Sequence, residues 1–141
     1  MIAIYFINAL IVAVAVLVHY EVLSRLTVLI PRLTISHRRL RVLIALCGSL
    51  LAHVAEVWIF ALSFYSLVSV GGYGTLAGNF DGSLLDCVYF SFTTYTTLGI
   101  GDIEPLGLLR FLVGLESLTG FLLITWTASF MFMEMSRNWK Q

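Results

Sequence analysis

Charged residues are scarce in this chain of 141 residues. Lysine and arginine together number 8, aspartate and glutamate also number 8, and the formal net charge is zero. Nucleic-acid binding requires a basic surface that neutralises phosphates, so we expect no nucleic-acid partner. Apolar residues make up 60% of the sequence, and the mean hydropathy of +0.97 is far above that of soluble domains. The chain is therefore predicted to be an integral membrane protein.

Cysteine is also rare. Cys47 and Cys87 are the only two, and neither is near a second thiol or a histidine at metal-ligand spacing. We interpret both as packing residues. About three membrane-spanning helices of ~20 residues would use most of the length and leave almost no domain outside the membrane. We therefore expect no enzyme and no bound cofactor, and a function that resides within the membrane.

The first apolar run predicts a transmembrane helix over residues 1–23. No basic segment precedes the run and no small-residue cleavage site follows it, which favours a retained helix over a cleaved signal peptide. In residues 24–41, arginines alternate with aliphatic residues, and Pro31 is expected to interrupt any helix. This composition predicts a linker at the lipid headgroups. The arginines expected to bind anionic lipid are Arg25, Arg32, Arg38, Arg39 and Arg41.

Two further apolar runs, 42–70 and 106–135, are long enough to span the membrane. Between them, residues 71–82 contain five glycines, which is a loop composition. Ser83 and Asp86 are candidate N-caps for an apolar and aromatic segment that ends at residue 95. Because this segment is too short to span the membrane, we expect a re-entrant helix. The predicted fold is an all-α membrane protein with three transmembrane helices and one re-entrant helix.

The distribution of positive charge predicts the orientation. The five linker arginines, together with Arg137 and Lys140, are seven of the eight basic residues, and only Arg110 lies elsewhere. The positive-inside rule then places the linker and the C-terminus in the cytoplasm and the N-terminus outside. We expect a multi-pass protein of the cell membrane whose outer loops are acidic.

Residues 96–102 carry the most informative pattern. Gly99 and Gly101 occupy alternate positions, and glycine permits backbone angles that side chains disfavour, so successive carbonyls can point the same way. In a membrane, irregular backbone is tolerated only where protein buries it or where it lines a water-filled path. A short re-entrant helix that leads into such a strand therefore predicts an ion path.

This stretch resembles the T-V-G-Y-G-D selectivity filter of potassium channels, with four of the six positions identical. Its residues are Thr97, Leu98, Gly99, Ile100, Gly101 and Asp102. The run from Tyr89 to Thr94 is similar to the aromatic pore helix of that family, and Pro105 and Gly120 match the later proline and the inner-helix glycine. The resemblance places the pore domain at residues 42–135 and a cytoplasmic tail at 136–141. The pore domain then consists of five segments in chain order: the outer helix 42–70, the extracellular loop 71–83, the pore helix 84–95, the filter 96–102 and the inner helix 106–135.

The resemblance implies a homotetrameric potassium channel, because one chain supplies one filter and four are needed around the axis. It also implies that the Thr97 hydroxyl and backbone carbonyls replace the hydration shell of K⁺ in stacked rings. The carbonyls would come from Thr97, Leu98, Gly99 and Ile100. Asp102 and Glu104 would form a negative ring at the outer mouth that concentrates cations.

Two positions depart from the family pattern, and three alternatives follow from the sequence. Leu98 occupies the position of the family's valine, and Ile100 occupies the position of its tyrosine. The aromatic ring that braces the filter in that family is therefore missing here. Ile100 makes a non-selective channel for Na⁺ and K⁺ the nearest alternative. A potassium transporter carries four pore repeats in one chain, whereas this chain has one. A non-conducting accessory protein is disfavoured because both filter glycines and Asp102 are intact.

One face of the inner helix is expected to line the pore below the filter, because its residues recur at three- and four-residue intervals. The pore-lining and gate candidates are Gly120, Phe121, Ile124, Thr125, Ala128 and Phe132. A ring of Phe132 side chains would close the pore by dewetting. Gly114 and Gly120 are interpreted equally well as a gating hinge or as a surface for close helix packing.

Three ionisable residues inside predicted spans are candidates for function, because charge is costly there and function is the default hypothesis. His53 and Glu56 are three residues apart on one helical face and can hydrogen-bond each other. We interpret them as a structural pair in preference to a proton sensor. Glu116 is expected to face the back of the pore helix, with Thr93 or Thr94 as its partner.

Overall fold

The computed structural model describes residues 2–33 and 38–139. Four helices dominate it, and three of them are long and apolar enough to cross a membrane. This confirms the predicted fold class of a membrane protein with three spanning helices and one short helix between the second and the third. The elements are α1 (Ile2–Arg32), α2 (Arg38–Val70), β1 (Gly74–Gly78), α3 (Leu84–Tyr95), β2 (Ile103–Gly107) and α4 (Leu109–Trp139).

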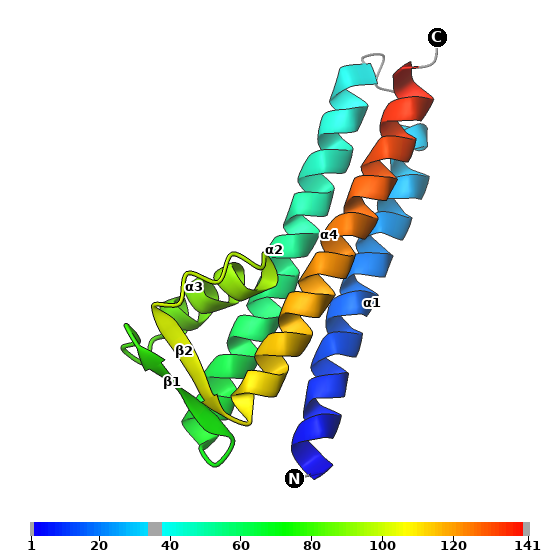
Figure 1. Cartoon of the computed structure of the whole chain (residues 1–141). Coiled ribbons are helices and arrows are strands. Elements are labelled where there is room, and N and C mark those ends of the chain that lie inside the picture. Colours follow the sequence, from blue (N-terminus) through cyan, green and yellow to red (C-terminus); the bar gives the residue numbers. More distant parts are fainter. Residues whose placement is uncertain (1, 34–37, 140–141) are drawn as a thin grey trace.

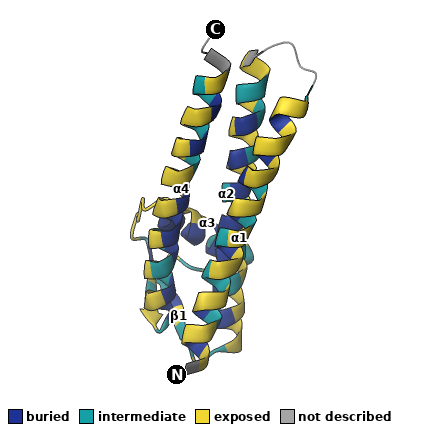
Figure 2. Cartoon of the chain, turned by 90° about the vertical axis from the view of Figure 1, so that its right-hand side faces the viewer, coloured by how far each residue is buried: buried dark blue, intermediate teal, exposed yellow. Residues whose placement is uncertain are grey.

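The three long helices lie side by side in one bundle, and α1 contacts both α2 and α4 (Figure 1). The short helix α3 and the two strands lie against one side of the bundle, in the half that contains the N-terminus. The C-terminal end of α4, the end of α1 and the start of α2 lie at the opposite end (Figure 1). Exposed residues make up much of the outward faces of α1 and α4 (Figure 2), as expected for helices that contact lipid or other subunits.

The first helix is longer than the sequence predicts. It continues to Arg32, with Pro31 in its last turn, so the boundary at residue 23 and the linker that begins at residue 24 are wrong. Packing explains the difference, because side chains of this segment at three- and four-residue spacing are buried against α2 and α4, which keeps the helix intact beyond the predicted boundary. These side chains belong to Leu23, Leu26 and Ile30. Residues 34–37 of the predicted linker lie outside the described residues.

The last two long helices also begin at other residues than predicted. The outer helix α2 starts at Arg38 instead of residue 42, and Arg41 Nη2 donates a hydrogen bond to the Leu33 carbonyl at 3.2 Å. The inner helix α4 starts at Leu109 instead of residue 106. The reason is that residues 103–107 form strand β2, which pairs with β1, so the helix begins only after this strand.

A two-stranded antiparallel sheet joins the segments before and after the re-entrant helix. Its register pairs Gly74 with Gly107 and Gly78 with Ile103. The sequence predicts only a loop over residues 71–83, because the glycines there have a loop composition. The sheet ties the two ends of the pore region together, and the hydrogen bond from Asn79 N to Asp102 O at 2.8 Å extends that tie to the filter.

The main core lies where α3 packs against α2 and α4. Phe60 and Phe64 of α2 are fully buried there with Tyr95 of α3. The rings of Phe64 and Phe90 pack edge to face, with their centroids 5.2 Å apart. Van der Waals packing of this kind drives helix association in lipid, where removal of apolar groups from water contributes little. The core therefore fixes the short helix that carries the candidate filter.

Candidate ion-conduction site

Hydrogen bonds to side chains define the start of the re-entrant helix α3. The Ser83 hydroxyl accepts a hydrogen bond from Asp86 N at 3.1 Å, so Ser83 is the N-cap. Asp81 accepts a hydrogen bond from Ser83 N at 2.7 Å. Its hydrogen bonds with Ser83 hold the pKa of Asp81 below its usual range. Helix α3 therefore starts at a defined place, directly after the loop.

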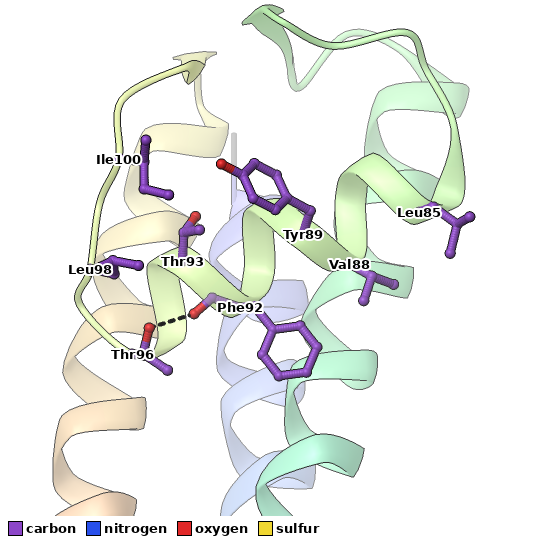
Figure 3. A pocket seen from close by; sticks show the side chains of 8 residues that line it. All are labelled: Leu85, Val88, Tyr89, Phe92, Thr93, Thr96, Leu98 and Ile100. Carbon is purple, nitrogen blue, oxygen red and sulfur yellow. Dashed lines mark hydrogen bonds between the residues drawn. The ribbon is translucent and has the colours of Figure 1, made fainter.

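The chain reverses direction at the end of α3. Thr96 N donates to the Phe92 carbonyl at 3.2 Å, and Gly99 N donates to the Thr93 carbonyl at 3.0 Å. The Thr96 hydroxyl also donates to the Phe92 carbonyl, at 2.7 Å (Figure 3). These bonds turn the filter strand back along its own helix, as a re-entrant loop requires.

The filter backbone has an alternating conformation. Thr97, Gly99 and Gly101 have φ values of 58°, 55° and 84°, whereas Leu98 and Ile100 are not in the positive region. Backbone that alternates in this way points successive N–H groups to one side, and the carbonyl oxygens then point to the other. The two glycines were predicted from their spacing. Thr97 was not, and it carries the strain of a non-glycine residue at positive φ.

Residues 96–101 are all exposed in the single chain. One side of the filter borders a groove with a volume of about 530 Å³ between the strand and α3 (Figure 3). Its lining is almost entirely apolar and consists of Leu85, Val88, Tyr89, Phe92, Thr93, Thr96, Leu98 and Ile100. The filter is thus held by α3 along one edge, while much of its surface is free to meet another molecule.

The outer end of the filter is anchored at Asp102. Its side-chain Oδ2 accepts a hydrogen bond from the Tyr89 hydroxyl at 2.9 Å, and its carbonyl accepts from Asn79 N at 2.8 Å. From the sequence, this segment was identified only as similar to an aromatic pore helix, and the bond from Tyr89 was missed. Glu104, the other residue predicted at the outer mouth, lies exposed on β2.

The predicted pore-lining residues of α4 divide into two groups. Phe121, Ile124, Thr125, Ala128 and Phe132 are exposed in the single chain. Gly120 is buried, and a Cβ atom there would lie 2.1 Å from the Tyr95 carbonyl oxygen.

The assignment of Gly120 to the pore lining is therefore wrong, because its Cα packs against the end of α3. This contact favours close packing among the two interpretations left open for that glycine. Gly114 differs, because no other described atom outside its own helix lies within 4 Å of a Cβ built there.

Glu116 is fully buried, as predicted, but its partner is different. The Ser91 hydroxyl is within hydrogen-bond distance of Glu116 and of the Val57 carbonyl, the latter at 2.9 Å. The expected partners, Thr93 and Thr94, do not fill this role. Instead, the Ser117 hydroxyl donates to the Thr94 carbonyl at 3.1 Å. These bonds tie the pore helix to both α2 and α4.

His53 and Glu56 are hydrogen-bonded as their spacing predicts, with 3.2 Å between His53 Nδ1 and Glu56 Oε2. Three further groups join them, namely His19 of α1, Tyr95 of α3 and Thr127 of α4. The role of His19 was not predicted from the sequence. The available signal was the position of a histidine within an apolar run, where an ionisable residue is costly. Ligand atoms of His19, His53 and Glu56 lie within 4.8 Å of one another, close enough to be tested as a metal site.

The fold and this geometry define a class of protein: a multi-pass membrane protein with a pore loop between its last two spanning helices. A family model described as an ion channel matches residues 52–137. That range covers more than half of the chain and includes most of α2, all of α3, the filter and almost all of α4. The chain belongs to this family of pore-loop cation channels. No curated protein and no solved structure gives a significant match.

Proposed function

We propose that four copies of the chain surround an axis and conduct K⁺ passively and selectively across the membrane. The observation that carries this proposal is the alternation of positive φ at Thr97, Gly99 and Gly101, in an exposed strand that follows a re-entrant helix. Such a strand is tolerated at membrane depth only where protein covers it or where it borders a water-filled path. A set of four strands with inward carbonyls meets both conditions.

In this arrangement the protein replaces the water around the ion. The Thr97 hydroxyl and the carbonyls of Thr97, Leu98, Gly99 and Ile100 bind K⁺ in successive rings, and each chain contributes a quarter of each ring. K⁺ is the permeant ion, and no resident cofactor takes part. Asp102 and Glu104 raise the local cation concentration at the outer mouth, an effect that salt screens.

The groove beside the filter supports assembly with other copies of the chain. Six of its eight lining residues are exposed in one chain, with values of 72% for Leu85, 66% for Leu98 and 57% for Ile100. An apolar surface of this kind next to a backbone strand is typical of a buried interface. In a tetramer with cyclic symmetry, the same surface of each chain meets the next chain around the ring.

A channel that conducts both Na⁺ and K⁺ is the second candidate, and Ile100 is the observation that favours it. Ile100 lines the groove with Tyr89 and Phe92 (Figure 3), in the place where the related filters carry a tyrosine. An aliphatic side chain packs there without a hydroxyl that could hydrogen-bond. If this loosens the filter, Ile100→Tyr will increase the preference for K⁺ over Na⁺, and an unchanged preference will show that the aromatic ring is not needed.

We further propose that the N-terminus is outside and the C-terminus is cytoplasmic. This orientation follows from the charge count, and it places the linker arginines where anionic headgroups are found. These residues are Arg25, Arg32, Arg38, Arg39 and Arg41. An exposed cysteine at Thr75→Cys, made in a Cys47→Ala background, should then react with an impermeant reagent added outside. Reaction only from the inside would reverse the orientation.

The test of the proposed function compares wild type with Gly99→Ala after reconstitution into liposomes. A Cβ at positive φ distorts the ion rings, but the tetramer is held mainly by the long helices. We expect Gly99→Ala to purify as a tetramer and to lose K⁺ flux or its preference over Na⁺. If Gly99→Ala conducts K⁺ with the selectivity of wild type, residues 97–102 are not the filter.

A further inference from the structure

A closed ring of hydrogen bonds lies in the middle of the bundle, where α1, α2, α3 and α4 meet. Five side chains form it, and each one contacts the next. We call it the proton ring. Its links join His19 Nδ1 to Glu56 Oε1 at 2.9 Å, Glu56 Oε2 to the Tyr95 hydroxyl, the Tyr95 hydroxyl to His53 Nδ1 at 2.9 Å, His53 Nε2 to Thr127 Oγ1 at 2.9 Å, and Thr127 Oγ1 to His19 Nε2 at 3.4 Å. His53 Nδ1 also lies 3.2 Å from Glu56 Oε2, a contact across the ring that is not one of its five links.

A count of hydrogens shows what the proton ring must contain. Each of the five links needs one hydrogen between its two heavy atoms. The two hydroxyls of Tyr95 and Thr127 supply one each, and two neutral histidines supply one each. The fifth is a further proton, carried either by Glu56 as the neutral acid or by a histidine as imidazolium beside the Glu56 carboxylate.

Both arrangements complete all five links, and both leave the proton ring electrically neutral. Neutrality matters here because an uncompensated charge inside a membrane is costly. Without the fifth proton, one nitrogen lone pair faces an oxygen lone pair, and a net negative charge remains in a site where His19 and Glu56 have no exposed surface. The fifth proton therefore completes the ring and neutralises it.

The position of the proton ring connects it to the filter. Tyr95 is the last residue of the pore helix and precedes Thr97 by two positions. Its carbonyl also contacts Gly120 of α4. His19 lies on α1, outside the range matched by the family model, and packs against the ring of Trp126 with centroids 5.3 Å apart. The proton ring thus links the additional helix α1 to the base of the filter.

The geometry points to His19 as a positioning residue for ion conduction, which holds Tyr95 and the filter base in place through the proton ring. This inference rests on the proposed function, because it concerns the same filter. As pH rises, the fifth proton leaves, one link is lost and the end of α3 is held less firmly. Potassium flux is therefore expected to fall with rising pH.

Other ionisable groups near the proton ring do not share its links. Glu116 of α4 is the other carboxyl close enough to influence Tyr95, and it is hydrogen-bonded to Ser91 instead. The titratable groups that face the site are therefore His19 from α1, His53 and Glu56 from α2, Tyr95 from α3 and Glu116 from α4.

A divalent metal ion is a weaker occupant of the same site than a proton. The ligand atoms of His19, His53 and Glu56 are close together, but each is already bonded to another member of the proton ring. A divalent ion bound by one carboxylate and two neutral histidines would leave one positive charge inside the membrane. The fifth proton leaves none.

The experiment measures potassium flux and selectivity of reconstituted channels from about pH 6 to about pH 9. Thr127→Val keeps the shape of the side chain and removes two links, whereas Thr127→Ser keeps the hydroxyl. We expect Thr127→Val to lower the flux about tenfold relative to Thr127→Ser, as the loss of two net hydrogen bonds implies. Equal flux in these two variants overturns the inference.

Glu56→Gln provides the second and independent measurement. Its amide accepts from His19 and donates to Tyr95, so it completes every link without a proton that titrates. We expect this variant to assemble and conduct near neutral pH and to lose the pH dependence of wild type. A pH profile identical to that of wild type overturns the inference, and this variant decides the question alone if Thr127→Val does not assemble.

Two controls distinguish the proton ring from a general loss of buried hydrogen bonds and from a metal site. Ser49→Ala removes a buried hydroxyl that, among the described residues, bonds only to the Ala45 carbonyl of its own helix, so its flux and pH profile should match wild type. Flux that a chelator abolishes and Zn²⁺ restores would assign the site to a metal and overturn the proton ring. If wild type itself passes no K⁺ at any pH, the proposed function fails. If wild type conducts but Thr127→Val and Thr127→Ser have equal flux, only the role of the proton ring is contradicted.

Discussion

Gly120 lies so close to the end of the pore helix that no larger residue fits without movement of a helix. An alanine Cβ at this position would lie 2.1 Å from the Tyr95 carbonyl oxygen and 2.9 Å from its carbonyl carbon. Ordinary contact between such atoms is about 3.5 Å, so α3 and α4 would have to separate by more than about 1 Å. The obstructing atoms belong to the backbone, which cannot rotate away as the tip of a side chain can.

Two opposing effects determine the result of Gly120→Ala. Alanine is a better helix former than glycine by about 0.8–1.0 kcal/mol. Overpacking a tight contact costs about 1–3 kcal/mol, and a clash with backbone belongs at the upper end of that range. We therefore expect a net loss of about 1–2 kcal/mol in the free energy of unfolding, together with lower flux, because the displaced atoms support the filter.

Gly114 is the matched control on the same helix. No other described atom outside α4 lies within 4 Å of a Cβ at Gly114, so Gly114→Ala should leave the stability unchanged or raise it by up to about 1 kcal/mol. Thermal unfolding of the purified proteins in detergent and potassium flux in liposomes give the two readouts. If Gly120→Ala unfolds at or above the temperature of wild type, the close approach to Tyr95 is not essential and the hinge interpretation of this glycine returns.

Two other predictions concern the ends of the conduction path. Tyr89→Phe removes the hydrogen bond to Asp102, which measures 2.9 Å; we expect the tetramer to form but its K⁺ preference over Na⁺ to decrease, and unchanged bi-ionic selectivity would contradict this. Phe132 is 71% exposed on α4, and a ring of four such side chains would form an apolar constriction. Phe132→Ala should therefore raise the open probability in single-channel recordings, whereas an unchanged or silent channel would count against a gate at this position.

The positive φ at Gly99 and Gly101 and the start of the pore helix were predictable because their signals are local. The spacing of Gly99 and Gly101 reflects the positive φ that both adopt, and the Ser83 N-cap lies directly before the helix that it starts. The pore lining from Phe121 to Phe132 was predicted from helical periodicity alone and stays a prediction. Each of these features involves residues within a few turns of one another.

Features that depend on contacts between distant segments were not predicted. The two strands, the bond from Tyr89 to Asp102 and the link from His19 to Glu56 each join residues that are well separated in the chain, and one sequence carries no periodic signal for such pairs. Packing also overrode a local rule, because α1 continues through Pro31. The same packing removed Gly120 from the predicted pore lining.

The reversal potential of wild-type channels in a planar bilayer tests the central claim most directly. With K⁺ on one side and an equal concentration of Na⁺ on the other, carbonyl rings at residues 97–100 that favour dehydrated K⁺ predict a large potential that opposes K⁺ flow. Exchange of the two solutions should reverse its sign. A reversal potential near zero in both configurations would contradict potassium selectivity and assign the pore to non-selective cation conduction.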